Sequence, residues 1–338
     1  MRIENIIVYI KCFVFIFISA FVFLIISNCS NLLDPQDCND DSYTEIRITT
    51  DDSEQMEPDV YGDIIVWQDK RNDNWDIYAY DLLAQSEIQI TSNEFDQFAP
   101  SIWQDKIVWK DNRNYKSDIY MYDLSTEKEI QITNDSFTIF SPIIYDNIIV
   151  WREHRNGSTD IYMYDLLTGE EKQVSNSGEV FRYPDIYGNK IVWQDNRNVN
   201  YDIYMYNITT NTETQITTND NHQWRPAIYD DKIVWTDNRN GGEREDIYMY
   251  DLSTKRETQI TSDGSDQWAP DINDNEIVWM DNRNKNWDIY IFDLQTKIES
   301  QLTIDQSTQY KPSIQNGKVV WTDERNGNKD IYMINLNQ

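Results

Sequence analysis

The amino-acid sequence predicts an all-β fold in which one unit recurs seven times. An apolar triplet that ends in tryptophan recurs along the chain at nearly constant spacing. Its tryptophans are Trp67, Trp109, Trp151, Trp193, Trp235, Trp279 and Trp321, which lie 42 residues apart except for one interval of 44. Each period also contains several strand-like segments separated by polar turns. A fixed period of this length, with several strands in each copy, predicts a seven-bladed β-propeller of four-stranded blades.

Each repeat is expected to contribute four strands. The first strand is short and follows a proline, as in Pro184–Tyr187, and the second carries the Ile-Val-Trp triplet. The third has the pattern Asp-Ile-Tyr-Met-Tyr-Asp-Leu, and the fourth has the pattern Glu-Thr-Gln-Ile-Thr. The second and third strands are apolar almost throughout, which is typical of a sheet covered on both faces. A propeller blade between two neighbours has this environment.

The first and last repeats are complementary, which predicts how the ring closes. The repeats open at Pro58, Pro100, Pro142, Pro184, Pro226, Pro270 and Pro312. The last repeat ends after its third strand, Asp330–Leu336, whereas Glu45–Thr49 precedes the first proline and matches the fourth-strand pattern. We therefore expect this N-terminal strand to complete the last blade and to remove the open sheet edges.

The chain before the repeats is predicted to direct the protein out of the cytoplasm. Residues 1–29 contain an apolar run of 16 residues, Cys12–Ser27, which suits a signal-peptide core better than a membrane span of about 20 residues. The segment Ile26–Cys29 resembles the lipobox of bacterial lipoproteins, except at Asn28. Three alternatives follow: a lipoprotein acylated on Cys29, an uncleaved membrane anchor and a cleaved secretion signal. Residues 30–44 are polar and acidic and are expected to tether the propeller domain, residues 45–338.

Composition restricts the partners. The chain has 59 acidic and 29 basic residues and a net charge of −30, so it would repel nucleic acid and anionic membrane surfaces. Contact with a membrane is expected through the N-terminal segment only. The three cysteines, Cys12, Cys29 and Cys38, lie outside the repeats and provide neither a disulfide framework nor a CxxC metal site. We predict no cofactor and no metal site.

The order of residues within the repeat resembles a known family. A proline is followed by Lys-Ile-Val-Trp-x-Asp-x-Arg-Asn, then by Asp-Ile-Tyr-Met-Tyr-Asp-Leu and Gln-Ile-Thr. This pattern is similar to the TolB-type propeller repeat, a WD-like repeat of prokaryotic cell-surface and extracytoplasmic proteins, and it covers Glu45–Gln338. The resemblance implies the propeller fold and an extracytoplasmic, envelope-associated location. It leaves the function open, because such repeats serve as binding scaffolds and as non-catalytic domains beside peptidases.

Residues common to all seven repeats are expected to build the scaffold. The tryptophan of the triplet should pack between blades. An invariant arginine follows the tryptophan, at Arg71, Arg113, Arg155, Arg197, Arg239, Arg283 and Arg325. Between the tryptophan and the arginine, six repeats have an aspartate and the third has Glu153. This pattern has two interpretations, a calcium loop or a turn stapled by carboxylate–guanidinium bonds. We favour the staple, because the guanidinium already places a cation in the loop.

Positions that differ between repeats are candidates for ligand recognition. Strand order places the loop that enters each first strand on the same face as the hairpin between the second and third strands. Two residues before the proline, an aromatic recurs at Phe98, Phe140, Trp224, Trp268 and Tyr310. The residue immediately before the proline differs most between repeats and is Arg225 in one of them. Aromatics around a channel mouth suit sugars or peptides, although they could instead plug the blade tips. The opposite face carries short turns and is expected to offer little side-chain chemistry.

The third repeat departs furthest from the common pattern. It contains Arg152, His154 and Arg155 in its second hairpin, and Arg182 lies in the loop that enters the next blade. Three arginines beside one histidine form a candidate site for a carboxylate or a phosphate. The alternative is sequence drift in a single repeat.

Two functions from different classes remain. The leading prediction is a non-catalytic extracytoplasmic binding or scaffolding module for a protein or carbohydrate ligand, anchored at the cell envelope. It rests on the scarcity of catalytic motifs, since the chain has two histidines and neither a GxSxG nor an HExxH motif. The alternative is an enzyme, a hydrolase or lyase acting on a polysaccharide, with its site at the channel mouth. Two carboxylates about 5–10 Å apart in a pocket, one with a strongly raised pKa, would favour the enzyme, and a shallow aromatic ring without such a pair would favour binding.

Overall fold

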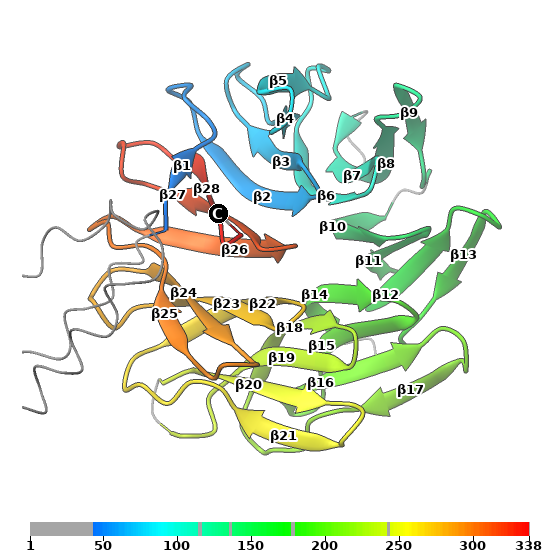
Figure 1. Ribbon diagram of the computed structural model, residues 1–338. Helices are drawn as coiled ribbons and strands as arrows, with labels where there is room; N and C mark the ends of the chain where they lie inside the picture. Colours follow the sequence, from blue (N-terminus) through cyan, green and yellow to red (C-terminus); the bar gives the residue numbers. More distant parts are fainter. Residues whose placement is uncertain (1–42, 114–116, 135–136, 177–179, 242–243, 338) are drawn as a thin grey trace, which may run out of the picture. The chain divides into compact units, whose positions relative to one another are not determined.

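Seven four-stranded antiparallel sheets form a ring in the computed structural model of the protein (Figure 1). The structure describes residues 43–113, 117–134, 137–176, 180–241 and 244–337. The predicted signal segment and almost all of the predicted tether lie outside these ranges. Within the described residues no helix is long and apolar enough to cross a membrane. The prediction of an all-β, seven-bladed propeller is confirmed.

The blades follow one another in chain order, and in each blade the first strand is innermost. Blades 1 and 2 comprise β2 (Gln55–Tyr61), β3 (Ile64–Asp69), β4 (Asp76–Asp81) and β5 (Ser86–Gln89), then β6 (Gln97–Trp103), β7 (Lys106–Asp111), β8 (Asp118–Asp123) and β9 (Lys128–Gln131). Blades 3 and 4 comprise β10 (Thr138–Tyr145), β11 (Ile148–Arg155), β12 (Ser158–Asp165) and β13 (Glu170–Gln173), then β14 (Val180–Tyr187), β15 (Lys190–Asn198), β16 (Asn200–Asn207) and β17 (Thr212–Gln215). Blades 5 and 6 comprise β18 (Gln223–Tyr229), β19 (Lys232–Asp237), β20 (Asp246–Asp251) and β21 (Arg256–Gln259), then β22 (Gln267–Asn273), β23 (Glu276–Asp281), β24 (Asp288–Asp293) and β25 (Glu299–Gln301). Blade 7 comprises β26 (Gln309–Gln315), β27 (Lys318–Asp323), β28 (Asp330–Asn335) and β1 (Ile46–Arg47).

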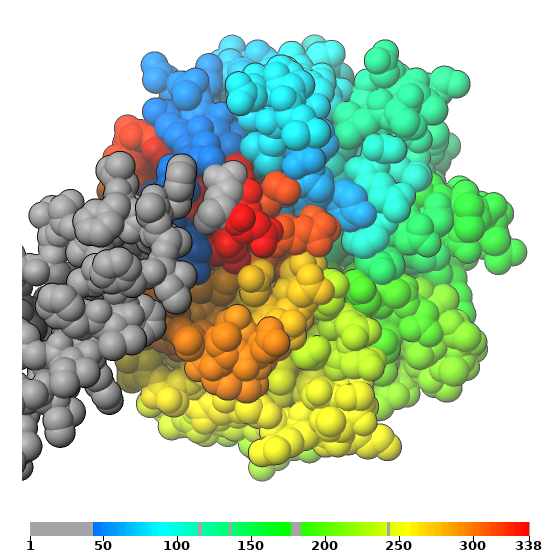
Figure 2. Space-filling model, in the orientation of Figure 1, coloured from blue at the N-terminus to red at the C-terminus, as the bar shows by residue number. Residues whose placement is uncertain are grey.

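The N-terminal strand closes the ring, as the sequence predicts. Strand β1 pairs antiparallel with β28, so that Ile46 lies opposite Met333. Arg47 forms an ion pair of 3.0 Å with Asp330, and the Thr49 hydroxyl accepts a hydrogen bond of 2.9 Å from the Ile331 amide. The first residues that the structure describes therefore lie against the last blade (Figure 2). The two ends of the repeat array hold each other in place.

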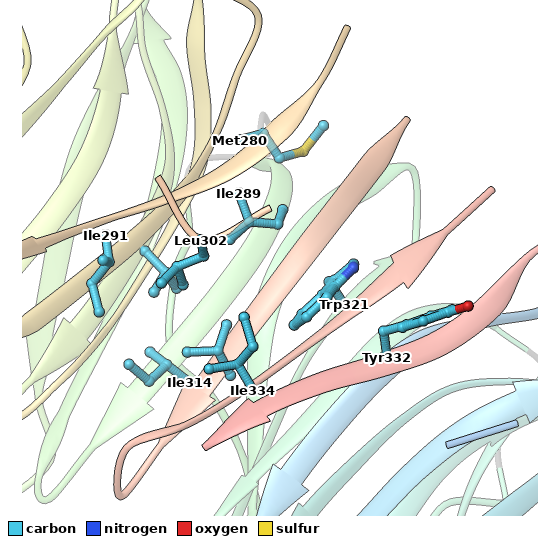
Figure 3. Close-up of a cluster of buried hydrophobic side chains, with 10 residues drawn as sticks. Met280, Ile289, Ile291, Leu302, Ile314, Trp321, Tyr332 and Ile334 are labelled. Atoms are coloured by element: carbon cyan, nitrogen blue, oxygen red, sulfur yellow. The ribbon is translucent and has the colours of Figure 1, made fainter. Parts of the chain in front are cut away.

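The core lies between blades. The seven tryptophans of the repeated triplet are fully buried, and each hydrophobic cluster contains residues of two neighbouring blades. The cluster between blades 6 and 7 contains Met280 and Ile289 of blade 6 together with Ile314 and Trp321 of blade 7 (Figure 3). Trp321 also stacks on Tyr332, with ring centroids 6.2 Å apart. The prediction that the tryptophans pack between blades is confirmed.

A polar staple holds the hairpin between the second and third strands of each blade. In blade 2 the buried Asp111 carboxylate accepts bonds from the Trp109 indole (3.1 Å) and from the Arg113 guanidinium (2.7 Å). Arg113 reaches Glu129 of the fourth strand at 2.7 Å and covers the ring of Tyr120 at 3.8 Å. The other blades contain the pairs Arg71–Asp69, Arg155–Glu153, Arg197–Asp195, Arg239–Asp237, Arg283–Asp281 and Arg325–Asp323. The staple, and not the calcium loop, is the correct interpretation.

Strand register separates the two faces of the ring. In blade 1, Gln55 at the start of the first strand pairs with Asp69 at the end of the second strand, and Asp69 pairs with Asp76 at the start of the third strand. The loops entering the first strands and the hairpins between the second and third strands therefore share one face, as predicted. We call it the entry face. Tyr61 and Ile64 pair at the other end of the strands, on what we call the turn face.

Removing the closing strand should destabilise the whole ring. A chain of residues 50–338 lacks β1 and Thr49 and leaves the edge of β28 open. We expect its urea midpoint to fall well below that of residues 43–338, the matched control, and its tendency to aggregate to rise. Equal midpoints for the two chains would show that β1 does not contribute to closure.

The two carboxylate partners of one staple arginine should differ in importance. Arg113→Ala leaves the fully buried Asp111 side chain without its counter-ion, and we expect a loss of about 3 kcal/mol in the free energy of unfolding. Glu129→Gln removes the exposed partner of the same arginine and should cost less than about 1 kcal/mol. Urea denaturation of both variants tests this. Similar losses would mean that the staple acts as a surface ion pair.

Candidate functional site

The central channel opens on the entry face into a cavity of about 280 Å³. The prolines at the start of the repeats and the residues on either side of them line it. The first strand contains a β-bulge here, seen in blade 1 as a register shift between Met56 and Asp59. The residue before the proline has a positive φ in five blades, at Glu57 (58°), Ala99 (51°), Arg225 (51°), Ala269 (53°) and Lys311 (56°). Such bulges re-aim side chains and recur beside active sites.

Three aspartates line the channel below this mouth, at the position after the proline. They are Asp59, Asp185 and Asp271. Each accepts a hydrogen bond from an amide of another first strand: Asp59 from Ile102 (2.9 Å), Asp185 from Ile228 (2.7 Å) and Asp271 from Ile314 (2.8 Å). The carboxylates thus join first strands to one another and are held in fixed positions.

The protein shifts the proton affinity of these carboxyls. Burial, together with the charge of Asp271, raises the pKa of Asp185 to about 7. Burial raises the pKa of Asp271 to about 6, with a further contribution from the charge of Asp59. Burial also raises the pKa of Asp59. All three side chains keep partial access to water, because they face the channel. The charge of Asp59 acts on Asp185 and Asp271, and that of Asp271 on Asp185, so the three carboxyls titrate as an interacting set.

Charged side chains surround the same mouth. Lys311 contacts the carboxylate of Glu57, so the two residues form a pair between blades 7 and 1. Burial and the nearby charge of Lys329 lower the pKa of Lys311 to about 8, while its contact with Glu57 opposes that decrease. The Arg225 guanidinium lies 4.2 Å from the centre of the Trp268 ring. Beside it, burial and the charge of Asp266 raise the pKa of Glu245 to about 7, whereas Arg225 acts to lower it.

The aromatics predicted for the site lie outside the lining of the mouth cavity. All five are half-buried, and among the predicted site residues whose side chains the structure describes only Arg225 lines that cavity. Each ring has a polar or charged neighbour. Arg225 covers Trp268, Arg152 covers Phe140 at 3.7 Å, and Lys110 lies 5.9 Å from Phe98. His222 stacks on Trp224 at 5.3 Å, and the Tyr310 hydroxyl donates a hydrogen bond of 3.4 Å to Glu324. The rings therefore form a partly accessible surface outside the mouth, and their role in binding stays a prediction.

The structure divides the predicted basic patch of the third repeat. Arg155 belongs to the staple with Glu153. Arg152 lies on Phe140, while His154 is exposed and its Nδ1 lies 2.8 Å from the Thr159 hydroxyl. Of Arg182, only the backbone in β14 is described. The structure therefore shows no single anion site formed by Arg152, Arg155 and His154 among the described residues.

Sequence reasoning missed two features of the channel. The position after the proline varies between aspartate, serine, isoleucine and alanine, and this variation was the available signal for the channel carboxylates. The expectation that the turn face offers little side-chain chemistry is wrong, because that mouth is lined by tyrosine and tryptophan rings. Among the described residues, no group of three or more histidines, cysteines or carboxylates is placed to hold a metal ion.

Several solved structures share this fold. An oligogalacturonate lyase in complex with manganese aligns with a TM-score of 0.70 at 14% identity, over 87% of this chain and 93% of the lyase. An oligogalacturonate lyase from Vibrio parahaemolyticus aligns with a TM-score of 0.69 at 14% identity, over 88% and 94%. Acylaminoacyl peptidase from Pyrococcus horikoshii aligns with a TM-score of 0.66 at 12% identity, over 83% of this chain and 51% of the peptidase. No curated protein matches the chain in sequence.

These findings correct the leading functional prediction. The prediction of a non-catalytic binding or scaffolding module is wrong: the channel carries carboxyls with raised pKa and the structures of similar fold include enzymes, so the findings favour the enzyme alternative. Similarity at 12–14% identity shows the fold alone, so the chemistry has to be argued from the channel residues.

The family itself follows from the sequence. The model of the TolB β-propeller domain matches residues 103–338, which is more than half of the chain and includes most of the repeats described above. The resemblance of the repeat to the TolB-type pattern is therefore confirmed. This chain belongs to the TolB β-propeller domain family.

Proposed function

We propose that this protein is an enzyme that cleaves a polysaccharide where the central channel opens on the entry face. The observation that carries this proposal is the group of channel carboxyls, in which Asp185 has a pKa of about 7 and Asp271 a pKa of about 6. Titratable groups whose environments separate their pKa values near neutrality are suited to acid and base roles. The similarity in fold to oligogalacturonate lyases supports the choice of a carbohydrate substrate.

The two carboxyls can divide the proton transfers that cleavage of a glycosidic bond requires. Asp185 holds its proton to the higher pH and is the proton donor to the leaving oxygen. Asp271 ionises first and is the base, which takes a proton from water in a hydrolase or from a sugar carbon in a lyase. Amide donors fix both carboxylates, so neither group has to be ordered when substrate binds.

The mouth favours a substrate with acidic sugars. The molecule carries a net charge of −30, yet the mouth presents the cations Arg225 and Lys311. A guanidinium can bind a sugar carboxylate through two parallel hydrogen bonds. The half-buried Trp268 beside Arg225 offers an apolar surface next to that contact. We therefore place a uronate-containing polysaccharide over the mouth.

A panel of purified polysaccharides tests the proposal. The full-length protein should release reducing ends from a uronate-containing polymer and leave neutral glucans uncut. A lyase would also generate an unsaturated uronate that absorbs ultraviolet light, whereas a hydrolase would not. Absence of cleavage of every polymer over the whole range from pH 5 to pH 8 would overturn the proposal.

Substitution of the channel carboxyls should remove activity and preserve the fold. We expect Asp185→Asn and Asp271→Asn each to lower kcat by about 10²–10⁴-fold, because each removes one proton transfer. Asp146→Asn, in an exposed turn, is the matched control and should retain full activity. The thermal midpoint of each variant shows whether the fold is intact. Folded Asn variants with normal kcat would assign Asp185 and Asp271 a purely structural role.

The pH dependence follows from the two pKa values. Activity should rise as pH increases through about 6, where the base Asp271 ionises, and should fall above about 7, where Asp185 loses its proton. Initial rates at low substrate concentration should therefore give a bell-shaped profile with its maximum between these values. A profile that is flat from pH 5 to pH 8 would contradict this assignment.

The location rests on the family and on the N-terminal sequence. Membership of the TolB-type family associates the chain with the periplasm or the cell envelope. We propose in addition that residues 1–29 export the chain and hold it at the membrane, and that Cys29 is acylated. Carbohydrate of the envelope or its surroundings would then be the substrate, and the membrane would be contacted through the N-terminal segment only.

Cys29→Ser tests the mode of anchoring. In the lipoprotein case the variant should leave the membrane fraction or accumulate unprocessed, and mass spectrometry of the wild-type protein should find an acylated Cys29 at its N-terminus. Cys38→Ser is the matched control and should not change the distribution. Unmodified Cys29 in a chain that still begins at Met1 would contradict lipidation.

A further inference from the structure

The turn-face mouth of the channel carries a continuous arc of aromatic rings. They are the last residues of the first strands in blades 1 to 5: Tyr61, Trp103, Tyr145, Tyr187 and Tyr229. Successive ring centroids lie 4.6, 4.1, 4.9 and 4.5 Å apart, and the planes are tilted by 40–57°. Tilted rings do not cover one another completely, and all five remain half-buried. The arc therefore presents aromatic surface to the mouth.

A cavity of about 350 Å³ lies inside this arc. Asn273 and Gln315 occupy the corresponding strand ends of blades 6 and 7, and the three channel aspartates contribute to the lining. Among the described residues that line this cavity, none is a lysine or an arginine. The cavity is thus walled by aromatic rings, amides and carboxyls without a cationic side chain.

We propose that this mouth binds a small organic cation with an alkylated ammonium group. Aromatic rings attract a cation through their quadrupole while accepting its apolar methyl or methylene groups. The carboxyls in the lining provide charge complementarity, and phenol oxygens can accept hydrogen bonds from an N–H. The volume of the cavity suits a small molecule better than a polymer chain. This inference concerns the other mouth of the channel, which shares the three aspartates with the entry-face cavity, and it does not depend on polysaccharide cleavage.

Two phenols of the arc, those of Tyr145 and Tyr229, have a raised pKa and stay neutral over the physiological range. Burial and the neighbouring Tyr187 raise the pKa of Tyr145 to about 12. The Tyr229 hydroxyl donates a hydrogen bond of 2.8 Å to the Asp274 carboxylate, and burial together with this bond raises its pKa. The Tyr229 ring is therefore held in place by a hydrogen bond, which lowers the cost of ordering it around a ligand.

The two mouths of the channel differ in their cationic side chains. Arg225 and Lys311 line the entry-face cavity, and the turn-face cavity has no such residues in the described part of its lining. An anionic sugar would meet carboxyls, aromatic rings and amides at the turn face, and its charge would find no cationic side chain among the described lining residues. A neutral sugar lacks the charge that the lining complements. A cation is the ligand class that this mouth fits best.

Two ligands of the same shape and different charge test the proposal. We would titrate the full-length protein with choline and with 3,3-dimethyl-1-butanol, its neutral isostere, by calorimetry at pH 8. Choline should bind in the millimolar range or tighter, and at least tenfold more tightly than the alcohol, a difference of about 1.4 kcal/mol. Equal affinities would identify an ordinary apolar pocket, and absence of choline binding would overturn the proposal. Binding of neutral sugars in place of choline would overturn it as well.

Variants locate the binding. Tyr187→Leu keeps apolar volume but removes the ring, and should weaken choline binding at least fivefold with the fold intact by circular dichroism. Trp224→Ala, on the entry face, is the matched control and should leave choline affinity unchanged. Equal weakening of choline binding by both variants would show that the arc does not form the binding site. Polysaccharide cleavage by Tyr187→Leu should be normal, so failure of this inference can be told apart from failure of the proposed function.

Discussion

The whole ring depends on one recurring interaction, the buried carboxylate that joins an indole to a guanidinium in each blade. In blade 5 the Asp237 carboxylate accepts bonds from the Trp235 indole (2.9 Å) and from Nε of Arg239 (2.9 Å). Arg239 also contacts Glu257 of the fourth strand. A single arginine therefore connects the core tryptophan to the outer edge of its blade. A buried carboxylate is acceptable only with such partners, so the residues of the staple have to occur together.

This constraint explains which parts of the repeat are free to vary. The staple and the interblade tryptophans occupy the second, third and fourth strands, whereas the channel is lined by the first strands. First-strand residues can differ from blade to blade provided that the first-strand amide of the next blade still has a hydrogen-bond acceptor. Asp59 and Asp185 supply that partner as carboxylates, and Ser101 supplies it as a hydroxyl that accepts from the Ile144 amide at 3.4 Å. The chemistry of the channel can therefore change while the scaffold stays the same.

The predictability of each feature follows from the same division. The blade count, the phase of the strands and the closure by Glu45–Thr49 could be predicted, because seven copies repeat one pattern of scaffold residues. The channel carboxyls could not be recognised in the same way, since an aspartate after a proline occurs in only three of seven repeats and carboxylates are abundant throughout. Their significance comes from convergence on one axis and from shared burial, which the spacing along the chain does not reveal. The sequence analysis instead selected the aromatics before the prolines, whose rings lie outside the lining of the mouth cavity.

The aromatic arc of the turn face could not be recognised from the sequence, because strand geometry alone does not bring its residues together. Side chains alternate along a strand, and the aromatic at the end of each first strand lies next to a short polar turn, where an exposed tyrosine needs no special explanation. Only the closure of the ring brings Tyr61, Trp103 and Tyr145 to within 4.6 Å of one another in succession. A ring of seven blades places any side chain at this register around one axis, so a modest preference for aromatics in successive repeats becomes a continuous wall. The same geometry collects Arg225 and Lys311 at the other mouth. The difference between the two described mouth linings, with cationic side chains at the entry face and none at the turn face, therefore arises from a few unrepeated residues on a repeated scaffold.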